Sequence, residues 1–166
     1  TVTGLVVGIL ALRMVAGRVG AGRMQGPGRS PGPALHAVRG GVLVTLLVGF
    51  SGVLLPVPHY WQPRVRIWRE PDYRKPLGRS SLAILLATAA ASWALLLIRI
   101  LAPALRDAAS HAAVIALVML IVDAQPWNTA WAGARILRWS KAAWALGALV
   151  SAASLFLASP FGLLLS

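Results

Sequence analysis

The chain has 166 residues, of which 58% are hydrophobic and 12% are charged. A soluble domain carries about 25% charged residues because its surface must face water, so this composition excludes an ordinary soluble fold and predicts a protein surrounded largely by lipid. The 16 lysines and arginines outnumber the 4 acids, but they lie mostly between apolar runs, which favours contacts with lipid headgroups or acidic partner subunits and argues against nucleic-acid binding.

Five apolar stretches are predicted to be membrane segments. A bilayer core of about 30 Å is crossed by roughly 20 apolar residues in a helix. Residues 80–102 meet this length and hold no charge before Arg99, whose long side chain can reach the membrane surface. In chain order, the predicted segments are residues 2–16, 34–56, 80–102, 108–123 and 142–165. We therefore expect an all-α fold, a single integral membrane domain over residues 1–166 that forms a polytopic bundle of four or five transmembrane segments.

Two of these segments have features that shorten or bend a helix. The apolar run at residues 111–122 is brief and ends at Asp123. Such a run is typical of a half-span, or of a helix that neighbouring protein shields from lipid. In the last segment, Pro160 and Gly162 are expected to break or kink the helix near its end.

The connections between the segments are irregular and basic. Residues 17–40 are rich in glycine and proline, which disfavour regular structure. The positive-inside rule relates the side of each connection to its content of lysine and arginine. These residues are more numerous in 56–79 and 124–141 together than in 17–40 and 99–106 together. Connections 56–79 and 124–141 are therefore expected in the cytoplasm, and connections 17–40 and 99–106 on the opposite side of the membrane.

Two groups of residues are candidates for contacts with other helices or with partners. Small side chains let helices approach closely in a membrane, whereas tryptophan and arginine gather where the membrane meets water. The helix-packing candidates are Ala87, Ala91, Ala94, Gly147 and Ser151. The interfacial or partner-docking candidates are Trp61, Arg64, Arg66, Trp68, Arg69, Arg135, Arg138 and Trp139.

Asp123 is the one acid that borders an apolar run. An ionisable group at membrane depth is costly, so a functional role is one interpretation. The structural interpretation, which we favour, is that this buried polar residue caps a helix end or pairs with Arg135 or Arg138. A proton pathway would need further ionisable groups nearby, and the other acids lie in polar connections.

No cofactor or metal site is predicted, although bound lipids are expected. The three histidines, His36, His59 and His111, do not share a helix face, as a pair of haem or zinc ligands would. The chain contains no cysteine, which excludes disulfides, iron–sulfur clusters and thiolate zinc sites. A single histidine that binds a pigment magnesium stays open as an alternative.

A series of short motifs follows a definite order along the chain. The motifs are Leu77-Gly78-Arg79, the apolar run Ala83-Ile84-Leu85-Leu86-Ala87-Thr88, Asp123-Ala124-Gln125-Pro126, Gly133-Ala134-Arg135-Ile136-Leu137 and the stretch from Arg138 to Trp144. This order resembles the core of the site-2 proteases, the intramembrane zinc metalloproteases. The resemblance places Thr88 where the family has an asparagine, and Asp123 at the first position of the family's Asn-x-x-Pro motif.

The residues that would make an active protease of this family are missing. The family binds zinc through the two histidines of an HExxH motif and an aspartate, and the glutamate of that motif is the general base. The chain contains no HExxH, and its expected place reads Arg13-Met14-Val15-Ala16-Gly17. The expected place of the aspartate reads Ala132, or Trp131 if the spacing shifts by one residue. The resemblance therefore implies a pseudo-enzyme, which is a protease-like scaffold without its metal.

These observations favour a non-catalytic integral membrane subunit that stabilises or helps assemble a larger membrane protein complex. Its expected partners are other membrane protein subunits and lipids with anionic headgroups, and its expected location is the prokaryotic plasma membrane. Two alternatives stay open. One is an active intramembrane metalloprotease whose HExxH lies upstream of Thr1. The other is a pigment- or haem-associated redox or photosynthetic subunit, or a small transporter.

Overall fold

The computed structural model describes residues 1–21, 35–36, 60–61, 74–127 and 131–159. Its helices are α1 (Val2–Ala21), α3 (Arg74–Leu101), α4 (Arg106–Ala124), α5 (Ala132–Trp139) and α6 (Lys141–Ala158), and a 3-10 turn, η3 (Pro103–Leu105), joins α3 to α4. Two short strands, β1 (Leu35–His36) and β2 (Tyr60–Trp61), pair in antiparallel orientation. Apart from β1, the membrane segment expected at residues 34–56 lies outside the described residues.

Among the described residues, four helical segments are long and apolar enough to cross a membrane. They are Val2–Gly20, Arg74–Leu101, Pro103–Ala124 and Lys141–Ala158. The predicted all-α transmembrane fold is thus confirmed, and the chain is a multi-pass membrane protein. The third of these segments has 22 residues, and it includes the shorter apolar run 111–122 from which a half-span or a shielded helix was expected. The expected break at Pro160 lies outside the described residues.

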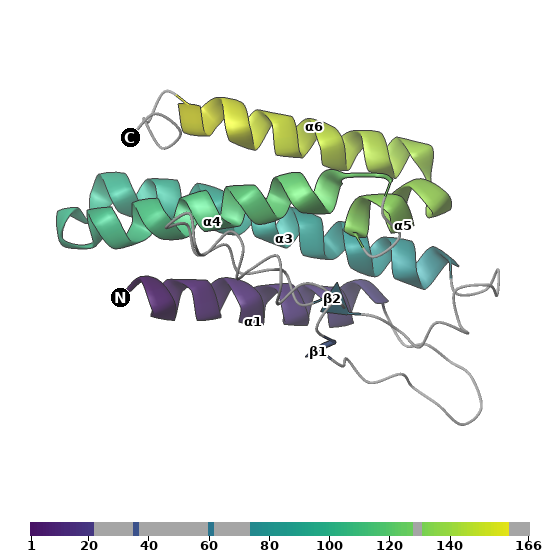
Figure 1. Cartoon of the computed structure of the whole chain (residues 1–166), viewed down its shortest axis with the longest axis horizontal. Coiled ribbons are helices and arrows are strands. Elements are labelled where there is room, and N and C mark those ends of the chain that lie inside the picture. The colour runs from purple at the N-terminus through teal and green to yellow at the C-terminus, as the bar shows by residue number, and fades with distance from the viewer. Residues whose placement is uncertain (22–34, 37–59, 62–73, 128–130, 160–166) are drawn as a thin grey trace.

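The four long helices form a bundle with α3 at its centre (Figure 1). α3 packs against α1, α4, α5 and α6. α1 and α4 run in one direction along the bundle, and α3 and α6 run in the other, with α1 and α6 on opposite sides (Figure 1). The short helix α5 lies beside the N-terminal part of α3, next to the start of α6.

Small side chains on α4 allow a close contact with its neighbours. Ala109, Ala112, Ala113 and Ala116 are all buried, and their spacing of three or four residues places them on one face of the helix. α3 contributes larger side chains to the same apolar cluster, including Leu95. The backbone of α4 can therefore lie close to α3, as expected for packing between membrane helices.

The residues predicted to pack helices together differ in their burial. Ala91, Gly147 and Ser151 are buried, and Ala87 is half-buried, but Ala94 is exposed. The Ser151 hydroxyl donates a hydrogen bond of 2.8 Å to the Gly147 carbonyl within α6. This hydroxyl is thus satisfied by its own helix, and the buried face of α6 stays compatible with an apolar contact.

Helix α4 ends inside the bundle, level with the middle part of α3, and α5 begins after a short connection (Figure 1). Gly133 in α5 lies so close to Ala124 and Gln125 that a Cβ atom would overlap their backbone. The indole N–H of Trp144 donates a hydrogen bond of 3.1 Å to the Ala124 carbonyl. A carbonyl at the end of α4 is therefore satisfied by protein, as non-helical backbone at membrane depth requires.

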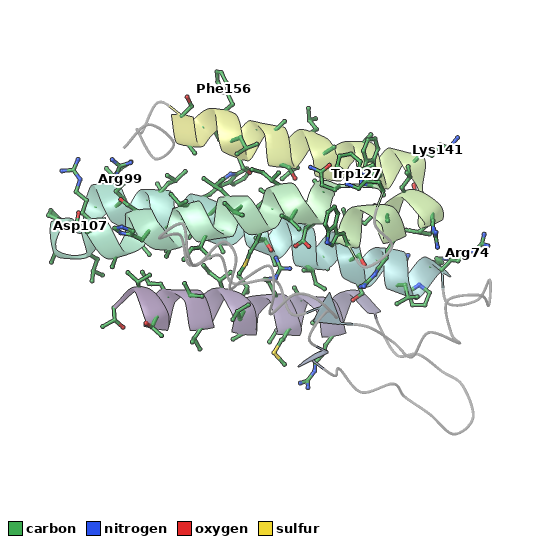
Figure 2. All side chains as sticks on the ribbon, in the orientation of Figure 1. Arg74, Arg99, Asp107, Trp127, Lys141 and Phe156 are labelled. Carbon is green, nitrogen blue, oxygen red and sulfur yellow. The ribbon has the colours of Figure 1, made fainter. Side chains whose placement is uncertain are left out.

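Apart from Arg13 and Asp123, the charged side chains of the described helices lie at the two ends of the bundle. Figure 2 shows Arg74 and Lys141 at one end and Arg99 and Asp107 at the other. We call the first of these the basic end. Among the described residues, its lysines and arginines lie in the last turn of α1, the first turns of α3, in α5 and at the start of α6, and they are Arg18, Arg74, Lys75, Arg79, Arg135, Arg138 and Lys141.

Helix α1 ends and α3 begins at this same basic end (Figure 1). The expectation that connections 17–40 and 56–79 lie on opposite sides of the membrane is thus wrong at their described ends. The sequence could not reveal this, because it does not show how many crossings separate α1 from α3.

Candidate functional site: a buried ion pair

A polar cluster lies inside the bundle, and each of its three side chains comes from a different helix. Arg13 is on α1, Thr88 is near the middle of α3, and Asp123 is in the last turn of α4. Arg13 is 6% exposed, and Thr88 and Asp123 are 0% exposed. Charged residues are rarely buried to this extent unless they are paired.

The guanidinium of Arg13 bridges the other two residues. Its Nη2 atom lies 2.7 Å from Oδ2 of Asp123, and its Nη1 atom donates a hydrogen bond of 2.7 Å to the Thr88 hydroxyl oxygen. That hydroxyl in turn donates to the Ile84 carbonyl at 2.8 Å. The threonine thus accepts from α1 and donates within α3, which uses both of its hydrogen-bonding roles.

The contact between Arg13 and Asp123 is an ion pair in which the N–H bonds are not aligned on the carboxylate. The two charged atoms lie at ion-pair distance, but among the described residues neither oxygen of Asp123 accepts a hydrogen bond of good geometry. The pair is therefore held mainly by electrostatic attraction. Asp123 keeps the capacity to accept further hydrogen bonds.

The depth of the cluster makes the pairing of charges important. Helix α3 has 28 residues, or about 42 Å at 1.5 Å per residue, and Thr88 lies close to its midpoint. An unpaired charge at the centre of a membrane is strongly unfavourable. The attraction between Arg13 and Asp123 offsets this cost, and the chain gains a link between α1 and α4.

The structure corrects the partner that we expected for Asp123. The sequence suggested Arg135 or Arg138, which are close in the chain, but the ion pair is made with Arg13. Arg13 lies close to the end of the segment expected over residues 2–16. Because α1 continues to Ala21, Arg13 is internal, and an internal arginine needs the acid of a neighbouring helix.

The three residues of the cluster coincide with three positions that the sequence resemblance singles out. By that resemblance, Arg13 would begin the place expected for HExxH, Thr88 would replace the asparagine, and Asp123 would stand first in the Asn-x-x-Pro-like motif. Arg13 and Thr88 are 75 positions apart in the chain, yet their side chains touch. Ala132, which the resemblance would put at the place of the metal-binding aspartate, packs in an apolar cluster with Leu85.

The remaining candidates for metal binding do not join this cluster. Among the described residues, no three His, Cys, Asp or Glu side chains form a group that could hold a metal ion. His111 is exposed, and its Nδ1 atom lies 2.8 Å from the Asp107 carbonyl in its own helix. The side chains of His36 and His59 lie outside the described residues. The interactions available to the cluster are an ion pair and hydrogen bonds, which can fix the positions of α1, α3 and α4 relative to one another.

The predicted interfacial residues are only partly described. The side chains of Trp61, Arg64, Arg66, Trp68 and Arg69 lie outside the described residues. Among the other three, Arg135 is buried, Trp139 is half-buried and Arg138 is exposed. Arg135 is therefore not exposed in the way that a docking residue would be.

Comparisons with protein-family models, with curated proteins and with solved structures find no match for this chain. A functional interpretation therefore starts from the buried cluster and from the surfaces of the bundle. The order of the short motifs along the sequence is a third observation on which a functional proposal can draw.

Proposed function

We propose that the protein is a non-catalytic membrane subunit, a protease-like scaffold without metal, that stabilises or helps assemble a larger membrane complex. The observation that carries this proposal is the ion pair between Arg13 and Asp123, with Thr88 bound to the same guanidinium. In a site-2 protease, the HExxH motif, whose expected place begins at Arg13 in this chain, binds a metal cation and so holds a positive charge. Here a guanidinium would take that role, and it would fix the helices instead of activating water.

The surface of the bundle supports a role in binding other membrane proteins. Helix α3 exposes a stripe that includes Ala90, Ala94 and Leu97. The two alanines are one helical turn apart, and small residues at this spacing permit close contact between membrane helices. Ala94 thus remains available for a helix of another subunit.

The proposed location is the prokaryotic plasma membrane. This finer assignment depends on the resemblance of the stretch from Arg138 to Trp144 to prokaryotic members of the protease family. The positive-inside rule would place the basic end of the bundle in the cytoplasm.

The proposal is tested by the mass of the particle that contains this protein. The full-length chain is extracted from its native membrane in a mild detergent, and its mass is measured by native mass spectrometry. We expect a complex heavier than the single chain. The substitution Ala94→Leu should remove the partner, because a larger side chain prevents close approach of a second helix.

A matched control is Ala153→Leu, which makes the same change at an exposed position of α6. It should leave the complex intact. A folded, monomeric wild-type chain would contradict the proposed role in a complex. Stoichiometric zinc in the purified full-length product would contradict the non-catalytic assignment and favour the protease alternative.

A further inference from the structure

The basic end of the bundle carries a strongly charged surface made of its exposed lysines and arginines. Among the described residues, none of these side chains forms an ion pair. They are Arg18, Arg74, Lys75, Arg79, Arg138 and Lys141, and we call them the basic surface. Arg135 is not part of it, because this side chain is buried and already has an interaction of its own.

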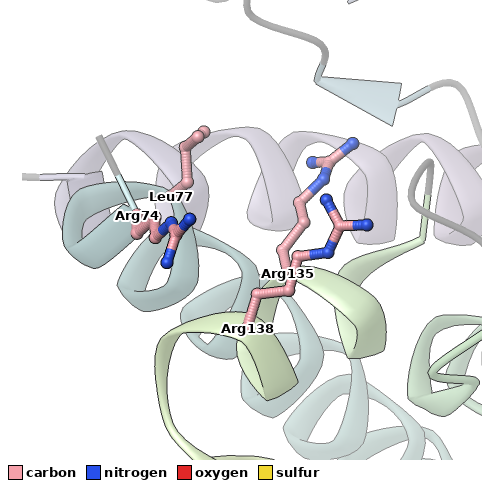
Figure 3. Close-up of a pocket in the computed structure, with 4 residues that line it drawn as sticks. All are labelled: Arg74, Leu77, Arg135 and Arg138. Carbon is pink, nitrogen blue, oxygen red and sulfur yellow. The ribbon is translucent and has the colours of Figure 1, made fainter. Parts of the chain in front are cut away.

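Contacts between helices bring these cations together. A Cβ atom on Gly20, at the end of α1, would lie 2.9 Å from the Arg79 carbonyl oxygen of α3. The close-up in Figure 3 shows Arg74 of α3 and Arg138 of α5 beside one pocket. The cations of α1, α3 and α5 are therefore neighbours, although these helices are far apart in the chain.

The helices that begin at this end add to the positive charge. Both α3 and α6 begin here (Figure 1), and neither has an acid in its first turn. The N-terminus of a helix is the positive end of its dipole, so cations such as Lys75 and Lys141 are unfavourable there. Arg18 differs, because it lies in the last turn of α1, where the dipole is negative. A negatively charged surface would therefore be attracted most strongly to the beginnings of α3 and α6.

The position of α3 favours an acidic protein surface over lipid. This helix lies at the centre of the bundle and packs against α1, α4, α5 and α6. Its first residue, Arg74, lies at the end of the bundle (Figure 2), whereas lipid headgroups surround the perimeter. A lipid headgroup also presents a single phosphate, but the basic surface extends over four helices. A folded partner can place several carboxylates opposite these cations in a fixed arrangement.

We propose that the basic surface binds an acidic, water-exposed surface of the partner subunit. This inference rests on the proposed function, because it names the chemistry of the partner in the proposed complex. Attraction between exposed charges is screened by salt. The apolar contact proposed at Ala94 is made by close packing and has no such screening. The two contacts therefore respond differently to salt.

The test uses the complex that the full-length chain forms in its native membrane, extracted in a mild neutral detergent. Its dissociation constant is measured by analytical ultracentrifugation while NaCl is raised from about 0.1 M to about 1 M, which shortens the Debye length from about 10 Å to about 3 Å. We expect the dissociation constant to rise about tenfold or more, because several exposed ion pairs each contribute up to about fivefold. A complex that is unaffected by salt would agree with the proposed function but overturn the role of the basic surface. A chain without any partner would contradict the proposed function itself.

Substitutions identify the cations that take part. Lys75→Gln and Lys141→Gln should each weaken the complex about twofold to fivefold, which is the effect of losing an exposed ion pair. The matched control is Arg106→Gln, which removes an exposed cation at the opposite end of the bundle. It should leave the dissociation constant unchanged. Equal losses in the control and in the two lysine variants would show that only net charge matters and would overturn the surface.

A last measurement separates the acidic partner from lipid. Phosphatidylglycerol that stays bound to the complex is counted by native mass spectrometry in the wild type and in the Lys75→Gln, Lys141→Gln double variant. We expect the same amount in both. If the double variant loses phosphatidylglycerol but binds its partner with unchanged affinity, these cations bind lipid and the acidic partner is wrong.

Discussion

The guanidinium of Arg13 on α1 and the carboxylate of Asp123 on α4 lie 2.7 Å apart inside a bundle of membrane helices. Thr88 on α3 accepts a hydrogen bond from the same guanidinium, so three helices meet at one charged group. The ion pair lies at a depth in the membrane at which an isolated helix would be surrounded by hydrocarbon. Both charges must therefore be present together, and this requirement makes the site testable by substitution.

Removal of one charge from this pair would leave the other buried without a counter-charge. We expect Asp123→Asn or Arg13→Gln to lower the free energy of unfolding by about 3–5 kcal/mol. The double variant Arg13→Met, Asp123→Leu should recover most of this loss, because no charge is then buried. The measurement is reversible unfolding in a detergent micelle, followed by circular dichroism.

The matched control for the acid is Asp107→Asn. Asp107 is exposed in the first turn of α4, and this change should alter the free energy of unfolding by less than about 0.5 kcal/mol. Single variants of the pair that were as stable as this control would show that the ion pair does not hold the helices together.

The hydroxyl of Thr88 is predicted to contribute separately from the ion pair. Thr88→Val keeps the shape of the side chain but removes the acceptor for Arg13, so the free energy of unfolding should fall by about 1.5–3 kcal/mol. Thr88→Ser keeps the oxygen and loses a methyl group, with an expected cost of about 1 kcal/mol. The hydrogen bond would be unimportant for stability if the valine variant unfolded at the same denaturant concentration as the serine variant.

The membrane helices were predictable from the sequence because their apolar runs are long, but their ends were not. The run from residue 80 identified α3, which in fact begins at Arg74. Pro76 lies in its first turn, where proline costs no helical hydrogen bond. In the same way, the first segment was expected to end at residue 16, whereas α1 continues to Ala21.

The candidate site was predictable only in part, for a physical reason. Asp123 could be singled out because an acid beside an apolar run is rare and costly. Its partner could not, since an arginine in α1 can either extend to the membrane surface or pair inside the protein. Only the packing of α1 against α3 and α4 decides between the two, and that packing depends on contacts between residues far apart in the chain.

The indole of Trp144 is predicted to stabilise the break between α4 and α5. Trp144→Phe keeps an aromatic ring but removes the hydrogen bond to the Ala124 carbonyl, and the expected loss in the free energy of unfolding is about 1 kcal/mol. Trp127→Phe is the control, because Trp127 is 73% exposed. If the two variants were equally stable, the carbonyl at the end of α4 would not need this donor.

Gly133 is predicted to be required for the close approach of α5 to the end of α4. A Cβ atom at this position would overlap the backbone of Ala124 and Gln125, and backbone cannot move aside as a flexible side chain can. We expect Gly133→Ala to lower the free energy of unfolding by about 1–3 kcal/mol, as overpacking does. The chain offers a matched comparison in Gly147 of α6, where a Cβ would lie 3.4 Å from a methyl group of Leu85, an ordinary contact.

Gly147→Ala should therefore be neutral, or stabilising by up to about 1 kcal/mol, because alanine favours the helix more than glycine does. Unfolding of both variants in the same detergent gives the difference directly. Equal stability of the two alanine variants would mean that α5 can move away from α4 at little cost. In that case, the short connection after Ala124 would not fix the position of α5 beside the end of α4.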